Sequence, residues 1–146
     1  MTYLSRLIEE LKENKLKVTW TKEFYSLEWC KLEPNTLFLF GDNLTHKGKR
    51  GQAIIRDEEN SLGIITKKYP SNYSTSFFTD NDYEEFKDIL DRKLDVLTTH
   101  LQSGNFDKII CNENIGAGLA KLDILAPKCY EYLMVQLREF EHVRML

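Results

Sequence analysis

Two glycine-rich segments carry the residue types best suited to chemistry in this chain of 146 residues. The first reads FGDNLTHKGKRGQAIIR from Phe40 to Arg56, and the second reads CNENIGAGLAKLD from Cys111 to Asp123. Glycine allows main-chain N–H groups to approach a ligand closely, and the lysines and arginines of the first segment add positive charge. Both segments are expected where short apolar strands end. The pattern predicts two loops that hold a phosphate-containing group from both sides.

The two segments also have a plainer interpretation, because ordinary strand-to-helix turns use glycine and asparagine for backbone reasons alone. The stretch GKRG lacks the GxxxxGK[ST] arrangement of a P-loop, and it is not a Rossmann dinucleotide fingerprint. The local charge favours a ligand. Between Thr45 and Lys68, six basic residues accompany three acidic ones, whereas the whole chain has a net charge of −3. The two loops and this local positive charge together indicate an anionic ligand. The alternative is that the charged segment is a solvated loop that binds no ligand.

Polar side chains follow two of the apolar runs. Asp42 and Asn43 come just past TLFLF. Asn43 offers a donor and an acceptor to ribose hydroxyls or a base edge, and a role in a turn or helix cap is the alternative. Lys67 follows LGIIT. It would neutralise a phosphate or, if desolvated beside another cation such as Lys68, act as a nucleophile. A solvated lysine with neither role is the alternative.

Hydrophobic periodicity predicts the elements that position these loops. Amphipathic spacing predicts four helices. Two of them cover residues 3–14 and 83–101, and the other two begin at Gln52 and at Pro127. Apolar or β-branched runs indicate strands over residues 16–21, 36–40, 62–66 and 108–111. We expect Asp80 or Asn81 to cap the long helix and Gly104 to end it.

Short strands that alternate with helices predict a single α/β domain over residues 1–146. Three layers are expected, with a mixed or parallel sheet flanked by helices. Ligands of such sheets bind in the crevice beyond the carboxyl ends of the strands. Both glycine-rich segments are expected at that edge.

Composition argues against several function classes. The chain is 42% hydrophobic, yet no apolar run approaches the ~20 residues of a membrane helix, and its charged amphipathic start is unlike a signal peptide. Cys30, Cys111 and Cys129 are too far apart for a disulfide framework or, with the scattered histidines, for a structural metal site. We therefore expect a cytoplasmic protein without metal, cofactor or membrane partner. The net charge argues against nucleic acid as a partner, and the sequence carries no indication of the oligomeric state.

Four stretches carry a resemblance: TLFLFGDN, GKRGQAIIR, LGIITKK and NIGAGLAKLD. They resemble a family of small phage and bacterial proteins and, more distantly, macrodomains, in which two glycine loops at strand ends hold the diphosphate of ADP-ribose. The resemblance covers residues 36–137 in short islands. It implies a macrodomain-like fold and, as partner, an ADP-ribose-like small molecule or an ADP-ribosylated protein. The residues expected to bind this ligand are Asp42, Asn43, Gly48, Gly51, Gln52, Arg56, Ile115, Gly116, Ala117, Gly118 and Leu119.

The resemblance also implies roles for individual residues. Main-chain amides of the two glycine loops, including that of Ala117, would bind the diphosphate. Asn43 would contact a ribose, and Arg56 and Lys67 would balance the phosphate charge.

Among macrodomains, the sequence is most similar to the branch that removes ADP-ribose from carboxylate side chains. There a lysine in an I-T-K-K segment is the nucleophile, and Lys67 falls on it. Ala120 stands where that branch has an aspartate after the I-G-x-G-L loop, and Asp123 lies three residues further on. The resemblance implies an ADP-ribosyl glycohydrolase in which Lys67 attacks the anomeric carbon or Asp123 supports an activated water. The alternative is a non-catalytic phage protein, in the host cytoplasm, that sequesters a nucleotide signal or blocks a host factor.

Overall fold

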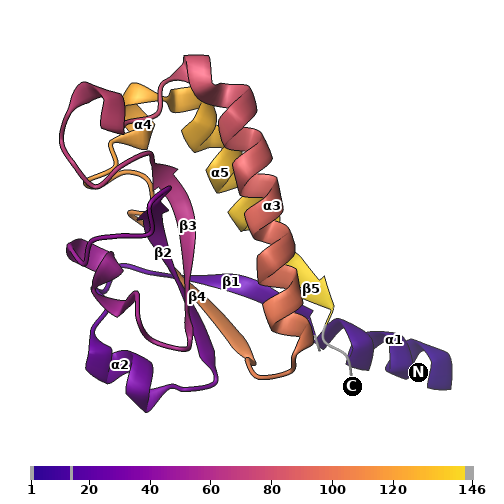
Figure 1. Ribbon diagram of the computed structural model, residues 1–146. Helices are drawn as coiled ribbons and strands as arrows, with labels where there is room; N and C mark the ends of the chain where they lie inside the picture. The colour runs from indigo at the N-terminus through magenta and orange to yellow at the C-terminus, as the bar shows by residue number, and fades with distance from the viewer. Residues whose placement is uncertain (1, 14, 144–146) are drawn as a thin grey trace.

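The computed structural model describes residues 2–13 and 15–143 (Figure 1). Its strands are β1 (Lys15–Thr21), β2 (Thr36–Asn43), β3 (Ser61–Lys67), β4 (Lys108–Asn112) and β5 (Glu141–Val143). Its α-helices are α1 (Tyr3–Glu13), α2 (Leu27–Leu32), α3 (Tyr83–Gln102), α4 (Leu122–Leu125) and α5 (Pro127–Glu139). Three short 3-10 helices are η1 (Gly51–Ile55), η2 (Ser74–Ser76) and η3 (Asp80–Asp82). The four predicted strands are present, and Asn14, the last residue of the first predicted helix, lies outside the described residues.

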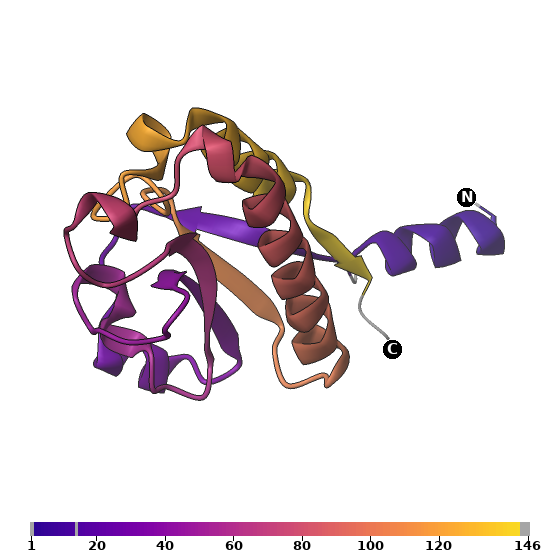
Figure 2. The same ribbon diagram turned by 45° about the horizontal axis from the view of Figure 1, so that its top comes forward.

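The five strands form one mixed sheet in the order β3-β2-β4-β1-β5. The first four strands run parallel, and β5 pairs antiparallel with β1 at the edge. The sheet is strongly curled, as Figures 1 and 2 show from two directions. The predicted α/β class with a mixed or parallel sheet is therefore confirmed. Parallel pairing of β2, β3 and β4 brings their carboxyl ends to the same edge, which is where the two glycine-rich segments begin.

Alternate side chains of β2 separate into two hydrophobic cores because successive residues of a strand point to opposite faces. Leu37 and Leu39 pack in the larger core with side chains of α3 and α5, such as Leu90 and Leu133. Phe38 packs on the opposite face. The core on that face also contains Tyr25, Cys30, Phe40, Ala53, Ile55 and Ile110. The two long helices thus lie on one face (Figure 1), while α2 and η1 contribute to the core of the other.

The segment predicted as an α-helix from Gln52 is instead η1, a single 3-10 turn. Its Ile55 is buried in the smaller core, and the N–H of Arg56 donates to the carbonyl of Ala53. The chain then passes through turns over residues 56–60 into β3, which begins at Ser61. The packing of η1 against the sheet therefore holds part of the segment between β2 and β3 in place.

The predicted cap of the long helix is wrong. Asp80 and Asn81 lie in η3, an additional turn that precedes α3, and the capping box forms between Thr79 and Asp82. The N–H of Thr79 donates to Asp82 Oδ2 at 2.9 Å. The predicted end of the helix is confirmed, because α3 stops at Gln102 shortly before Gly104. The short elements α4 and β5 were not predicted, since neither is long enough to show a periodicity.

The thiols of Cys30, Cys111 and Cys129 are all free and buried. Burial raises the pKa of Cys30 and of Cys129 to about 11, so these thiols stay protonated near neutral pH. Over residues 2–13 and 15–143, no helix combines the length and the apolar character needed to cross a bilayer. The same residues include no group of three or more His, Cys, Asp or Glu side chains placed to hold a metal ion.

Candidate functional site

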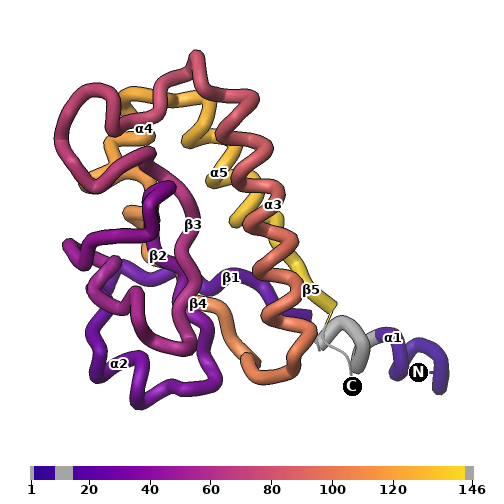
Figure 3. Tube along the Cα trace, in the orientation of Figure 1, coloured from indigo at the N-terminus to yellow at the C-terminus, as the bar shows by residue number. Residues whose placement is uncertain are grey.

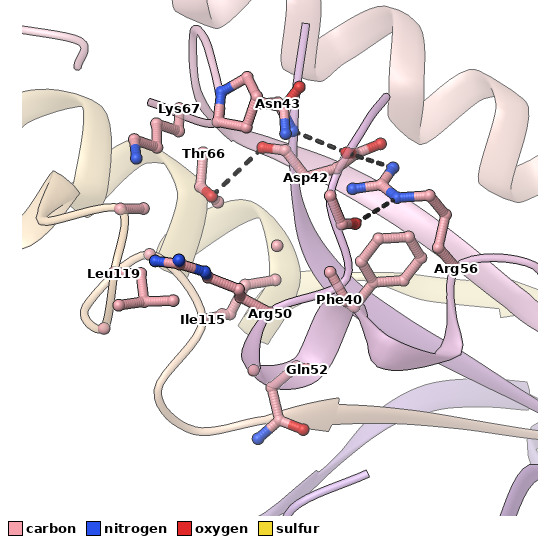
Figure 4. A pocket seen from close by; sticks show the side chains of 18 of the residues that line it. Phe40, Asp42, Asn43, Arg50, Gln52, Arg56, Thr66, Lys67, Ile115 and Leu119 are labelled. Carbon is pink, nitrogen blue, oxygen red and sulfur yellow. Dashed lines mark hydrogen bonds and ion pairs between the residues drawn. The ribbon is translucent and has the colours of Figure 1, made fainter. Parts of the chain in front are cut away.

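A cavity of about 950 Å³ lies at the carboxyl ends of β2, β3 and β4 (Figure 4). The last residues of these strands, Asn43, Lys67 and Asn112, all line it. Crevices at this edge of a parallel sheet are the usual ligand sites of α/β proteins. The cavity is therefore the first candidate for a functional site.

Two loops contribute to the lining of this cavity. The first loop (residues 44–60) connects β2 to β3, and the second loop (residues 113–121) connects β4 to α4. Figure 3 traces both loops to the same side of the molecule. They approach each other at Gly51, where an added Cβ atom would lie 3.9 Å from Leu119 Cδ1. The two glycine-rich segments therefore border the same cavity.

The structure brings together most of the residues that the sequence predicts as ligand contacts. Those that line the cavity are Asp42, Asn43, Gly48, Gly51, Gln52, Arg56, Ile115, Gly116, Gly118 and Leu119, together with Lys67. Ala117 and Asp123 are not part of the lining, although Ala120 is. Asp123 lies in the first turn of α4, which the fully buried Leu122 anchors to the core. The predicted support of a water by Asp123 gains nothing from this placement and stays a prediction.

Main-chain N–H groups of both loops have no acceptor within the part of the chain that the structure describes. They include those of Gly48, Gly51, Gln52, Gly116, Gly118, Leu119 and Ala120. Ala117 differs from its neighbours, because its N–H donates to the carbonyl of Asn114 at 2.9 Å. It is not the free donor that the sequence predicts. N–H groups without a partner carry partial positive charge, and several of them around one cavity suit an anion.

Arg56 holds the first loop in place. Its Nη1 donates to Asp42 Oδ1 at 2.6 Å, its Nε to the carbonyl of Gly48 at 2.8 Å, and its Nη2 to that of Lys47 at 3.2 Å. The Asp42 carboxylate is 3% exposed, and its Oδ2 lies 2.8 Å from His46 Nδ1. These bonds use three of the five guanidinium N–H groups and pair the charge of Arg56 with Asp42, so its predicted balancing of phosphate charge stays a prediction. Its role is to shape the loop that carries the free amides.

Asn43 likewise serves the first loop and not a ribose. Its Nδ2 donates to the carbonyl of Lys47 at 2.7 Å. Its Oδ1 accepts from the N–H of Thr45 at 3.0 Å and from the Thr45 hydroxyl at 2.6 Å. Both polar atoms of the amide are therefore engaged within five residues of chain. The turn-forming alternative describes this residue better than the predicted ribose contact.

We expect Arg56→Lys to lower the free energy of unfolding by roughly 1–3 kcal/mol, because one ammonium cannot reproduce three hydrogen bonds directed by a planar guanidinium. Urea denaturation measures the effect. Arg92→Lys is the matched control, since Arg92 forms only an exposed ion pair with Asp88 on α3. Equal unfolding free energies in the two variants would contradict the role assigned to Arg56.

Lys67 lies among cations. It is 8% exposed, and its Nζ is 4.6 Å from the centroid of the Phe77 ring. The Nζ of Lys121 is 5.7 Å from the same centroid. Burial lowers the pKa of Lys67 below its ordinary value, and the charges of Lys121 and Arg50 lower it further. The sequence predicts a desolvated lysine beside a second cation, but the neighbours are Lys121 and Arg50 rather than Lys68.

Ion pairs consume much of the positive charge that the sequence places between residues 45 and 68. The pairs are Lys49–Asp57 at 2.5 Å, Arg56–Asp42 at 2.6 Å and Lys68–Asp82 at 3.2 Å. Arg50, Lys67 and Lys121 form no salt bridge with any carboxylate that the structure describes. Lys47, which also lines the cavity, likewise has no salt bridge among the described residues, so Lys47, Arg50 and Lys67 carry the unpaired positive charge of the lining.

Phe24 is a cavity residue that the sequence reasoning missed. It is 72% exposed and lines the cavity after the end of β1. Hydrogen bonds fix the backbone on either side of it: the N–H of Tyr25 donates to Gln52 Oε1 at 2.7 Å, and Asn112 Nδ2 donates to the carbonyl of Glu23 at 2.8 Å. The available signal was an aromatic residue just past a strand that ends at the same edge as the glycine loops.

One protein-family model matches residues 20–136, a range that includes both loops, Phe24 and Lys121. The chain belongs to this family, described as "Family of unknown function (DUF7831)". Neither the curated proteins nor the solved structures yield a match. Membership in DUF7831 brings no activity with it and no link to macrodomains, so the function has to be argued from the cavity.

Proposed function

We propose that this cavity binds ADP-ribose or a related nucleotide diphosphate, in a macrodomain-like fold of three layers. The observation that carries the proposal is the pair of glycine loops that line one cavity and whose N–H groups lack acceptors among the described residues. The volume of about 950 Å³ falls within the roughly 300–1,000 Å³ typical of small-molecule sites. A dinucleotide-sized ligand is therefore compatible with the space.

The diphosphate is assigned to the space between the loops. The amides of Gly51 and Gln52 in the first loop, and those of Gly116 and Gly118 in the second loop, supply the donors. Main-chain donors of this kind are suited to phosphate oxygens because the geometry of the loops fixes them before the ligand arrives.

The two ends of the cavity suit the two ends of such a ligand. Phe24 follows β1 and Lys67 ends β3, and β2 and β4 separate these strands in the sheet. Figure 4 shows Gln52, whose side chain binds the backbone beside Phe24, at the opposite end of the view from Lys67. An exposed aromatic ring stacks well on a base, and a lysine suits the anionic or sugar end. The ligand is therefore assigned with its base toward Phe24.

Titration calorimetry with ADP-ribose tests the proposal, with AMP and inorganic phosphate as partial ligands. We expect saturable binding of ADP-ribose and much weaker binding of the two fragments, because each fragment makes only part of the contacts of the whole ligand. An absence of heat with ADP-ribose at millimolar concentration would contradict the proposal.

We expect Lys67→Ala to weaken ADP-ribose binding about tenfold, since the variant removes a charged donor from the cavity. Lys68→Ala is the matched control, because the Lys68 ammonium pairs with Asp82. Calorimetry on both variants provides the comparison. Equal affinities of the two variants would remove Lys67 from the binding site.

A second candidate function is the removal of ADP-ribose from carboxylate side chains, and the lowered pKa of Lys67 favours it. After loss of its proton, the Lys67 amine would attack the anomeric carbon, the carboxylate would leave with the bonding electrons, and water would then release the sugar and restore the amine. Release of ADP-ribose from an ester-modified protein tests this step. We expect Lys67→Ala to lose release while Asp123→Asn retains it. Binding without release by the unaltered protein would favour the non-catalytic alternative, in which the chain sequesters a nucleotide.

A further inference from the structure

The segment between β1 and α2 (residues 22–26) presents Phe24 to the cavity from an anchored backbone. Phe24 is 72% exposed, whereas its neighbour Tyr25 is 4% exposed and belongs to the smaller core. The Tyr25 hydroxyl donates to the carbonyl of Leu39 at 2.7 Å, which attaches the segment to β2. An exposed aromatic ring beside a buried anchor is placed before a ligand arrives, so less conformational entropy is lost when a flat group stacks on it.

Two side-chain amides hold the backbone on either side of Phe24. Gln52 Oε1, from η1 in the first loop, accepts from the N–H of Tyr25 at 2.7 Å. Asn112 Nδ2, at the end of β4, donates to the carbonyl of Glu23 at 2.8 Å. The Phe24 segment is therefore attached both to the first loop and to the strand from which the second loop begins.

Gln52 connects the two ends of the proposed ligand. Its main-chain N–H has no acceptor among the described residues and is assigned to the diphosphate, while its side chain binds the backbone beside Phe24. Figure 4 shows the Gln52 side chain at the far end of the view from Lys67. The N–H of Tyr25 has no other acceptor in the part of the chain that the structure describes. The main chain alone would serve the diphosphate, so the glutamine side chain calls for a separate explanation.

We propose that Gln52 is a positioning residue that holds Phe24 in place for the base of the ligand. The inference rests on the proposed binding of a nucleotide diphosphate and names the residue that sets how strongly its base is bound. Without the Gln52 acceptor, the N–H of Tyr25 lacks a partner, and the backbone that carries Phe24 shifts to find one. The ring then no longer stacks on the base, whereas the main-chain amides still hold the diphosphate.

Calorimetry with ADP-ribose and with inorganic diphosphate, which has no base, tests the inference. The readout is the affinity for ADP-ribose divided by that for inorganic diphosphate, because damage to the diphosphate site alone weakens both ligands. We expect Gln52→Met, which keeps the size of the side chain and removes the acceptor, to lower this ratio about tenfold. Gln52→Glu restores an acceptor, so its ratio should not fall below that of the unaltered protein, although its charge weakens both ligands. Gln136→Met on α5 is the matched control, because Gln136 does not line the cavity.

A double-mutant cycle separates positioning from direct contact with the ligand. Phe24→Ala should also lower the ratio about tenfold. Adding Gln52→Met to that variant should then change the ratio less than about twofold, because the ring that Gln52 positions is already absent. A second full loss in the double variant would overturn the inference, since Gln52 would then act independently of Phe24. Thermal unfolding verifies that each variant is folded.

The remaining outcomes distinguish the inference from the proposed function. If ADP-ribose binds and Gln52→Met leaves the ratio unchanged, the inference fails and the proposed function stands. If Phe24→Ala leaves the ratio unchanged, the base lies elsewhere and the inference is again wrong, while binding of the diphosphate stands. If the unaltered protein binds no ADP-ribose, the proposed function and the inference fail together.

Discussion

Gly118→Glu abolishes ADP-ribose binding, with an expected loss of affinity of at least about a hundredfold. Gly118 lines the cavity, and an added Cβ atom there would meet no other atom within 4 Å. The glutamate side chain therefore has room to form, but it fills the space assigned to the diphosphate and adds a negative charge. Calorimetry measures the affinity, and urea denaturation verifies that the variant is folded.

Gly118→Ala is the matched control for this prediction. A methyl group fits the open space beside the second loop, so we expect an affinity within a few-fold of the unaltered protein and an unchanged free energy of unfolding. ADP-ribose binding of normal strength by the glutamate variant would place the ligand elsewhere.

Gly63→Ala has the largest expected effect on stability. A Cβ atom at Gly63 would lie 2.4 Å from Asp42 Oδ2 and 2.8 Å from Asp42 Cβ. The carboxylate has little freedom to move away, because it is buried and bonded to Arg56 and His46. The alanine must displace either β3 or the Asp42 carboxylate with its hydrogen bonds. We therefore expect the free energy of unfolding to fall by about 2–4 kcal/mol. Urea denaturation measures it.

Gly118→Ala again serves as the control, since both variants exchange glycine for alanine and only one meets a clash. The result links stability to the site: Asp42 can hold Arg56, and through it the first loop, only if β3 leaves room for the carboxylate. Similar unfolding free energies for the two alanine variants would show that the network yields at little cost.

The sheet and the position of the cavity could be predicted because both follow from local patterns. The run TLFLF has apolar residues at every position, and the structure buries Leu37 and Phe38 on opposite faces of the sheet. Once the strands are parallel, the rule that ligands bind at their carboxyl ends locates the two glycine-rich segments. The approach of Gly51 to Leu119 follows from this placement.

The roles of individual polar side chains could not be predicted in the same way. Asn43 and Arg56 are suited by residue type to a ribose and a phosphate, but the structure uses them within the first loop. Hydrogen-bond partners depend on tertiary geometry, because a backbone carbonyl such as that of Lys47 competes for the same donors. The residue types indicated that these side chains form polar contacts, but the sequence did not indicate which groups they contact.

The same limit applies to the second loop. Lys121 approaches Lys67 although 54 positions of sequence separate them, and no local pattern reports this contact. Asp123 shows the reverse case. It follows the glycine loop closely in sequence, but the short helix α4 carries it out of the cavity lining.

An ADP-ribose titration followed by the amide signals of the labelled protein in ¹H–¹⁵N NMR spectra tests the central claim most directly. The account predicts saturable shifts of the Gly51, Gln52, Gly116 and Gly118 signals, the amides that have no acceptor in the described structure. Ala117 and the residues of α3 should respond less, since their N–H groups are already engaged. Shifts confined to other regions, or an unchanged spectrum at millimolar ligand, would contradict it.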